Sequence, residues 1–231
     1  MTWSPTFSSV EAGGATCQVA PSPTARAARL ENVRARDAAE VAALLNALPV
    51  DMPWDVAIEP TDPVGPLLRD AGFTAYATTF RASRPIEGLA EGDPADGVRM
   101  LTYANDMAVR YEDAEREALE GLATFTEMGR PTGYAQGAGH GDFTVALRGD
   151  RIIGFCFTQV PEGIVWWLGV VPDERRKGVG RMLVAAAARA VRTAGGTHML
   201  AEPEATPEAK GFLGALRFRE RGTRDLLIKK V

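Results

Sequence analysis

The stretch Val170–Arg181, VVPDERRKGVGR, joins an apolar run to an alanine-rich segment through a basic turn that contains two glycines. The apolar run, Ile164–Val171, is rich in β-branched and aromatic residues, which predicts a buried strand. Apolar residues then recur at helical spacing over Val179–Arg192, which predicts a helix. The basic turn therefore lies where a strand ends and a helix begins.

A turn of this kind is suited to hold phosphate. The first turn of a helix leaves N–H groups without partners, and the helix dipole places roughly half an elementary positive charge there. Gly178 and Gly180 lack the Cβ atoms that would keep a diphosphate from the backbone. Countercharge is available from four basic residues: Arg175, Arg176, Lys177 and Arg181. The alternative interpretation is a tight turn whose basic side chains form a solvated surface.

Two other nucleotide-binding motifs do not fit this turn. A Walker loop needs a Lys-Ser or Lys-Thr pair directly after its last glycine, whereas Gly180 is followed by Arg181 and Met182. A dinucleotide-binding fingerprint needs a third glycine, which would fall at Leu183. The turn therefore belongs to neither class.

The motif Val170-Val171-Pro172 is followed by Arg175-x-x-Gly178-x-Gly180, an alanine-rich helix, a strand, a short helix and Phe218. This order, over roughly residues 97 to 231, resembles the GCN5-related N-acetyltransferase (GNAT) superfamily. The resemblance implies an α/β (α+β) fold with a mixed central sheet flanked by helices. It also implies that the basic loop grips the diphosphate of acetyl-CoA.

The same resemblance assigns cofactor contacts to three segments. Main-chain groups around Leu168, Gly169 and Val170 would bond the pantetheine and polarise the thioester carbonyl, and Gly169 suits a β-bulge there. Thr206, expected to cap the following helix, takes the position of a family asparagine near the cofactor. The diphosphate would be held by the loop residues Arg175, Arg176, Lys177, Gly178, Val179, Gly180 and Arg181.

Both catalytic residues that are usual in the resembled family are absent. The glutamate expected on the strand before the loop is replaced by Trp166, and the tyrosine expected five residues before Phe218 is replaced by Leu213. A base is still needed, because an amine with a pKa near 10 is only about one part in a thousand neutral at pH 7. The candidate substitutes are Glu202 and Glu162 as bases, and Tyr134, Tyr103 and Tyr111 as acids.

The resemblance implies an acetyl-CoA-dependent N-acetyltransferase that moves the acetyl group directly to a primary amine of an unidentified small molecule or peptide. The alternative is a non-catalytic acyl-CoA-binding sensor or regulatory module that has lost its base and acid. Five acidic residues between Glu112 and Glu120 border the expected acceptor cleft, either to attract a cationic amine or as a solvated helix face. Trp166 and Trp167 are expected on opposite faces of their strand.

The chain also predicts two domains. Residues 85–97, rich in Gly, Pro and acidic residues, form an expected linker between residues 1–84 and a GNAT domain at 98–231. The segment Leu67–Phe73 parallels Phe212–Phe218, so the N-terminal part resembles a partial copy of the GNAT fold, as in mycothiol-synthase-like tandem transferases. An alignment puts Ala27 and Arg29 at the two loop glycines, so this copy is not expected to hold CoA.

Composition sets the remaining expectations. The chain has 231 residues and is 45% hydrophobic, which is enough to form the substantial core of a soluble enzyme. Its net charge of −4 gives no reason to expect nucleic-acid binding. No apolar run approaches the roughly 20 residues of a membrane span, and no signal-peptide pattern is present, so a cytoplasmic location is expected. Two histidines and two distant cysteines, Cys17 and Cys156, predict free thiols and no metal site. An incomplete N-terminal half would leave a sheet edge unpaired, and pairing of that edge with a second copy of the chain would form a homodimer.

Overall fold

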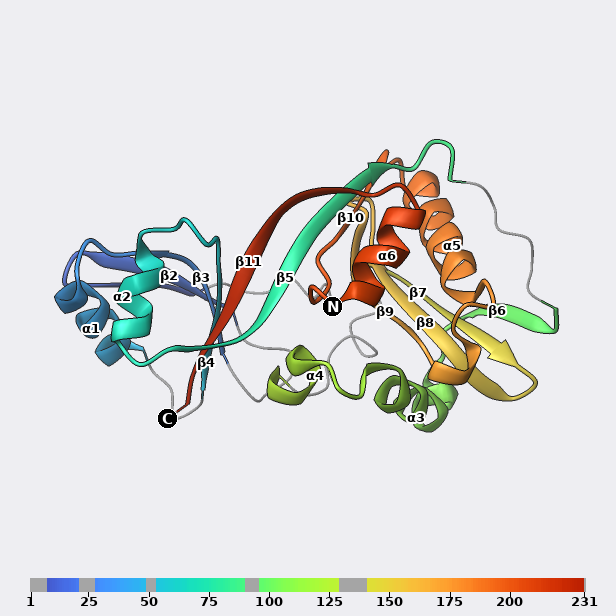
Figure 1. Cartoon of the computed structure of the whole chain (residues 1–231), viewed down its shortest axis with the longest axis horizontal. Coiled ribbons are helices and arrows are strands. Elements are labelled where there is room, and N and C mark those ends of the chain that lie inside the picture. The colour runs from blue at the N-terminus through green and yellow to red at the C-terminus, as the bar shows by residue number, and fades with distance from the viewer. Residues whose placement is uncertain (1–7, 21–27, 49–52, 90–95, 129–140, 231) are drawn as a thin grey trace. The chain divides into compact units, whose positions relative to one another are not determined.

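The computed structural model describes residues 8–20, 28–48, 53–89, 96–128 and 141–230 (Figure 1). The chain divides into two compact units. Unit 1 takes the described residues within 81–122 and 132–221, and unit 2 takes those within 4–80, 123–131 and 222–231. Two strands, β5 (Thr74–Pro85) and β11 (Arg219–Lys229), contribute residues to both units. The boundaries expected from the sequence, at 84 and 98, stay a prediction.

Unit 1 contains a mixed sheet. Three consecutive antiparallel pairings join β6 (Val98–Thr102), β7 (Gly141–Arg148), β8 (Arg151–Gln159) and β9 (Ile164–Val170). Next to β9 lies β10 (His198–Ala201), which runs parallel to it and pairs antiparallel with the end of β5. The predicted mixed sheet and the β7–β8 hairpin are confirmed, with Gly149 in a left-handed conformation at the turn.

Helices cover both faces of this sheet. Leu183 and Val179 of α5 (Val179–Thr193) lie against Gly154 on one face of β8. The next residue of β8, Phe155, contacts Tyr111 of α3 (Ala108–Leu119) at a ring distance of 5.2 Å. Because neighbouring strand residues point to opposite faces, α5 and α3 pack on opposite sides of the sheet.

Shorter elements complete unit 1. A 3-10 turn, η1 (Asn105–Met107), leads into α3, and η3 (Pro172–Glu174) leads from β9 toward α5. The last helix of this unit is α6 (Pro207–Ala215). The side of α5 that faces the sheet is apolar, and its buried residues are Val179, Met182, Leu183, Val184, Ala185, Ala187, Ala188 and Val191.

Unit 2 repeats the central part of this arrangement. β1 (Ser8–Ala12), β2 (Ala15–Ala20) and β3 (Ala28–Arg34) pair antiparallel in sequence, and β3 pairs parallel with β4 (Trp54–Ile58). Helix α1 (Ala38–Ala47) connects the two parallel strands, as α5 connects β9 to β10. Its further elements are α2 (Val64–Asp70), α4 (Ala123–Met128) and the β11 segment that pairs with β4.

Side chains alternate between the two faces along β3 and along β4, and one face is apolar whereas the other is polar. Leu30 and Val56 belong to the buried cluster that includes Val41 and Leu44 of α1. On the other face, Asp55 accepts hydrogen bonds from Arg29 (Nε to Oδ2, 2.6 Å) and from Tyr76 (Oη to Oδ1, 2.7 Å). The expected alignment of Arg29 with a loop glycine is therefore wrong, because Arg29 is a strand residue committed to a buried carboxylate.

Two further features bear on the expectations above. Cys17 and Cys156 are buried free thiols, as predicted, and burial raises the pKa of Cys156 to about 12. In the described parts of the chain, no helix is both long and apolar enough to cross a bilayer.

Truncation of Leu183 tests the contact between α5 and the sheet. Leu183 is fully buried, so Leu183→Ala is expected to lower the free energy of unfolding by about 2–5 kcal/mol. Val109→Ala, at a position that is 74% exposed, is the matched control and should change it by less than about 0.5 kcal/mol. Urea unfolding followed by circular dichroism measures both, and equal effects would contradict the packing described.

Candidate functional site

The parallel strands β9 and β10 separate soon after they begin. Leu200 pairs with Ile164 and Ala201 pairs with Val165, and β10 then ends, whereas β9 continues to Val170. In the described part of the chain, no strand pairs with β9 beyond Val165 on this side. The C-terminal half of β9 therefore presents one edge of its backbone without a neighbouring strand.

The register shows which backbone groups face that open edge. The Val171 N–H donates to the Ile153 carbonyl (3.1 Å), so this pair is hydrogen-bonded to β8. Bonded and non-bonded pairs alternate in an antiparallel ladder, so Gly169 also faces β8. The N–H and C=O groups of Leu168 and Val170 point away from β8, toward the open edge. Gly169, the third residue expected to contact a cofactor through its backbone, faces β8 instead, and the Val170 carbonyl accepts from Arg175.

A β-bulge lies at Trp166, not at Gly169 as expected. Phe157 pairs with Trp167 and Thr158 pairs with Val165, which leaves Trp166 as the extra residue. Gly169 is required for another reason: a Cβ at this position would lie 2.4 Å from the ring of Phe155. The glycine therefore admits an aromatic ring from the neighbouring strand.

The bulge also places both indoles on the same face, so their expected positions on opposite faces are wrong. Trp167 Nε1 donates to Glu115 Oε1 of α3 (2.9 Å). Trp166 Nε1 donates to Gln159 Oε1 (2.8 Å), and Gln159 lies two residues beyond Phe157 and four beyond Phe155. These β8 residues share the face that packs against α3. Strict strand alternation fails here because the bulge inserts one residue.

Glu115 is a site residue that the sequence did not single out. It is 2% exposed, and its Oε1 accepts from Tyr111 Oη (2.6 Å) as well as from Trp167. The sequence grouped it with four acidic neighbours as one helix face, and the other four (Glu112, Asp113, Glu117 and Glu120) are exposed. The sequence feature that could have identified Glu115 is its position four residues after Tyr111, which puts both side chains on one side of α3.

The N-terminus of α5 lies at the end of the basic turn. Its N-cap is Gly178, at φ 89°, and no side chain caps its N–H groups. A Cβ at Gly178 would meet nothing within 4 Å, so the space beside this turn is open. Gly180 serves packing instead, because a Cβ there would lie 3.1 Å from the ring of Phe212 in α6. Val179 is buried, so only its backbone faces the turn.

The four basic residues of the turn have different surroundings. Arg175 donates to the carbonyls of Val170 (3.1 Å) and Ala118 (2.9 Å), so it ties the turn to β9 and α3. Lys177 Nζ lies 3.5 Å from Glu174 Oε1. Arg176, with φ 65°, and Arg181 are exposed and form no ion pair with any described residue. Their charges are thus available to an anion.

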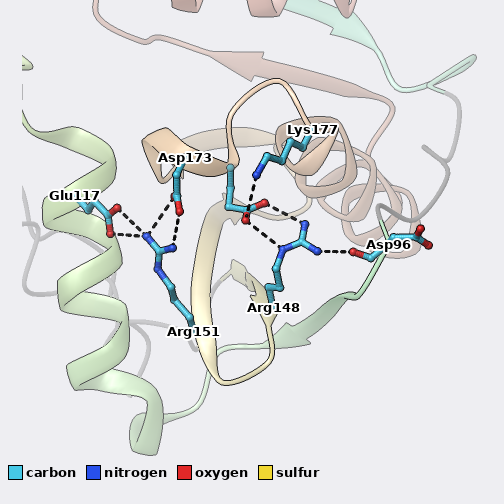
Figure 2. Close-up of polar contacts among 7 residues, drawn as sticks. Asp96, Glu117, Arg148, Arg151, Asp173 and Lys177 are labelled. Carbon is cyan, nitrogen blue, oxygen red and sulfur yellow. Dashed lines mark hydrogen bonds and ion pairs between the residues drawn. The ribbon is translucent and has the colours of Figure 1, made fainter.

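Two carboxylates anchor the turn to the β7–β8 hairpin (Figure 2). Glu174 accepts from Nε and Nη2 of Arg148 (3.1 and 3.0 Å), and Asp173 accepts from Arg151 (2.7 Å). Arg151 also binds Glu117 of α3 (2.8 Å). Hydrogen bonds from Arg148 and Arg151 lower the pKa values of Glu174 and Asp173 respectively, so both carboxylates stay charged at neutral pH.

The remaining predicted residues are placed as follows. Glu202 is half-buried and directly follows β10, one residue past its last pair with β9. Thr206 is the N-cap of α6, as expected, and its Oγ1 accepts from Ala209 N (3.1 Å). Leu213 is buried. Tyr134 lies outside the described residues. Burial and the nearby Glu112 raise the pKa of Tyr103.

Comparison with known proteins agrees with this geometry. Residues 139–219 match the model of the acetyltransferase (GNAT) domain family. The chain contains a GNAT domain. No curated protein matches the sequence.

Solved structures of GNAT proteins share the fold at low sequence identity. A GCN5-related N-acetyltransferase from Kribbella flavida is 18% identical, with a TM-score of 0.65, over 96% of this chain and 89% of its own. A tandem GNAT protein from the clavulanic acid biosynthesis pathway is 17% identical, with a TM-score of 0.64, over 95% and 81%. A GCN5-related N-acetyltransferase from Sphaerobacter thermophilus is 14% identical, with a TM-score of 0.63, over 94% and 76%.

The anchor of the GNAT loop gives a prediction with a defined pH dependence. Because Arg148 lowers the folded-state pKa of Glu174, its contribution to stability is present above the unfolded pKa of about 4.3 and is lost as pH falls through the folded value. Arg148→Met is therefore expected to lower Tm at pH 7, and the Tm difference should shrink between about pH 5 and pH 3. Calorimetry over that range measures it.

The control for this experiment is Arg116→Met. Arg116 lies 3.3 Å from Asp113, but both side chains are more than half exposed, so little change in Tm is expected at any pH. A Tm difference for Arg148→Met that is equally large at pH 7 and at pH 3 would contradict the assigned role of Glu174.

Proposed function

We propose that the chain is an acetyl-CoA-dependent N-acetyltransferase that moves the acetyl group to a primary amine of a small molecule or peptide. The observation that carries this proposal is the combination of an uncapped α5 N-terminus with the open edge of β9. The first is suited to a diphosphate and the second to an extended amide-bearing arm, and acetyl-CoA has both groups.

The exposed cations support the cofactor assignment. Gly178 leaves room beside the helix terminus, and Arg176 and Arg181 offer charge that no described side chain neutralises. Arg175 and Lys177 would contribute through the shape and field of the turn, since Arg175 is held by two carbonyls. Thr206 lies at the N-terminus of α6, the helix whose Phe212 packs against Gly180. We therefore expect both helix N-termini to border the bound cofactor.

The reaction would be a direct transfer. The neutral amine attacks the thioester carbonyl carbon, the C–N bond forms, the C–S bond breaks, and CoA leaves as its thiolate, while the nitrogen releases one proton, which ends on the CoA sulfur. Backbone N–H groups of Leu168 and Val170 at the open edge are suited to polarise the carbonyl oxygen. A CoA thiolate is a tolerable leaving group because thiol pKa values lie near 8.5.

Glu202 is our candidate for the base that takes the proton from the ammonium. It lies level with Trp166, at the point where β10 ends and β9 continues. Tyr134 remains a candidate to protonate the departing sulfur, since the α6 position that would supply a tyrosine is the buried Leu213. With proximity and carbonyl polarisation, these groups suffice for the transfer.

We also propose that unit 2 is a second, degenerate GNAT-like unit that holds no CoA. The N-terminus of α1 is closed by its own carboxylates: Asp37 Oδ1 accepts from Glu40 N (2.9 Å), and Glu40 Oε2 accepts from Arg36 N (2.7 Å). These carboxylates occupy backbone N–H groups that a phosphate would need.

Charge reversal in the turn tests the cofactor site. Arg181→Glu and Arg176→Glu are each expected to weaken acetyl-CoA binding by about 10- to 100-fold, because each removes a charge-assisted contact. Arg219→Glu, an exposed residue of the same unit, is the matched control and should change Kd by less than about twofold. Calorimetric titration gives Kd, and failure of the parent protein to bind acetyl-CoA would refute the cofactor assignment.

Substitution of Glu202 tests the base. Glu202→Gln is expected to lower kcat by about 100-fold, while the Kd for acetyl-CoA stays unchanged. Glu87→Gln, at an exposed position just after β5, should leave both intact. CoA release and the mass of the acetylated amine measure turnover. Binding of acetyl-CoA without turnover across a broad amine panel would contradict the transferase proposal.

A further inference from the structure

We infer that Trp166 and Trp167 form the wall of the acceptor site and that the acceptor is a primary amine carried on an aromatic or apolar group. This inference rests on the proposed function, because it takes the thioester to lie at the open edge of β9. The two indoles are consecutive residues at the bulge of that strand, directly before Leu168 and Val170. An attacking nitrogen must come within about 3–3.5 Å of the carbonyl carbon, which brings the acceptor past these side chains.

Both indoles are held in fixed orientations. Trp166 Nε1 donates to Gln159 Oε1 (2.8 Å), and Trp167 Nε1 donates to Glu115 Oε1 (2.9 Å). Glu115 is itself fixed by Tyr111 Oη (2.6 Å). A ring that is already oriented loses little conformational entropy when a ligand packs on it. Gln159 and Glu115 therefore act as positioning residues for the wall.

Exposure distinguishes the two rings. Trp166 is 46% exposed, and it is one of three large apolar side chains that are exposed in the described part of the chain. Of the other two, Leu101 lies on β6, three positions from β9 in the strand order, and Val109 lies near the start of α3. Trp166 alone among them combines exposure with a hydrogen bond that fixes its ring. It offers a prepared surface beside the proposed reaction centre.

The chemistry of the surrounding face selects the acceptor class. An indole face attracts cations more strongly than other aromatic faces do, and the acceptor approaches as an ammonium ion. The exposed indole of Trp166 matches a ring or an alkyl group on the amine and offers little to a polyhydroxylated or polycationic one.

Calorimetric titration of the CoA-loaded protein with phenethylamine tests the inference. Trp166→Ala is expected to weaken phenethylamine binding by about five- to tenfold, and Trp166→Phe, which keeps a smaller ring, by about two- to threefold. The Kd for CoA should be unchanged in both variants, which shows that they are folded. Val109→Ala, an exposed apolar truncation elsewhere in unit 1, should bind phenethylamine like the parent protein.

Four further ligands separate the contributions of the charge and of the ring to binding. Phenethyl alcohol, which lacks the charge, and ethanolamine, which lacks the ring, should each bind at least fivefold more weakly than phenethylamine. Spermidine and glucosamine represent the polycationic and polyhydroxylated classes. Tighter binding of either than of phenethylamine, or no effect of Trp166→Ala, would overturn the inference.

The positioning role of Gln159 has its own readout. Gln159→Leu removes the oxygen that holds Trp166 and is expected to raise KM for the amine about threefold to fivefold, with kcat and KM for acetyl-CoA within twofold. Gln159→Glu restores the acceptor oxygen and should restore KM. Equal changes in both KM values would indicate a general structural effect and contradict the assignment.

These outcomes are separable from those of the proposed function. If the parent protein does not bind CoA, the proposed function fails first. If CoA binds and phenethylamine binds independently of Trp166, only the acceptor wall is refuted. If phenethylamine binding depends on Trp166 and no amine is turned over, the wall stands and the transferase proposal fails.

Discussion

The early end of the parallel pairing between β9 and β10 is the constraint on which the rest of the site depends. Parallel strands normally satisfy each other's backbone groups along their shared length. Here the pairing covers Ile164 and Val165 and then stops, so Leu168 and Val170 keep backbone groups that point to an edge without a strand. The Val170 carbonyl accepts from Arg175, and the remaining backbone groups of this edge are suited to an extended ligand with its own amides.

The bulge at Trp166 adds to this divergence. An inserted residue increases the local twist and bends the strand, so β9 turns away from a neighbour that ends at Ala201. The same insertion rotates Trp166 onto the face of Trp167, beside α3. One local irregularity thereby bends the strand whose edge is open and gathers two indoles on one face, which are the sides that the proposed function assigns to the thioester and the acceptor.

The sequence was informative where local patterns decide the structure. The apolar run, basic turn and alanine-rich helix fixed β9, the turn and α5, and Gly149-Asp150 located the hairpin. It was misleading where an irregularity or a distant contact decides. Alternation of side chains assumes an unbroken strand, so it placed Trp166 on the wrong face. Both turn glycines were expected to make room for a diphosphate, although Gly180 accommodates the ring of Phe212. Neither the bulge nor that ring has a local signature.

Comparison of the two helix N-termini explains why one fold would bind a diphosphate in one unit and not in the other. α1 and α5 both follow a strand and lead to a parallel partner. At α1, the carboxylates of Asp37 and Glu40 accept from backbone N–H groups, and Glu40 is also paired with the guanidinium of Arg36. At α5, Gly178 supplies no capping oxygen, and the nearby carboxylates Asp173 and Glu174 are turned to Arg151 and Arg148. The arginines of the hairpin therefore do more than anchor the turn: by neutralising its carboxylates, they leave its positive field to an incoming anion.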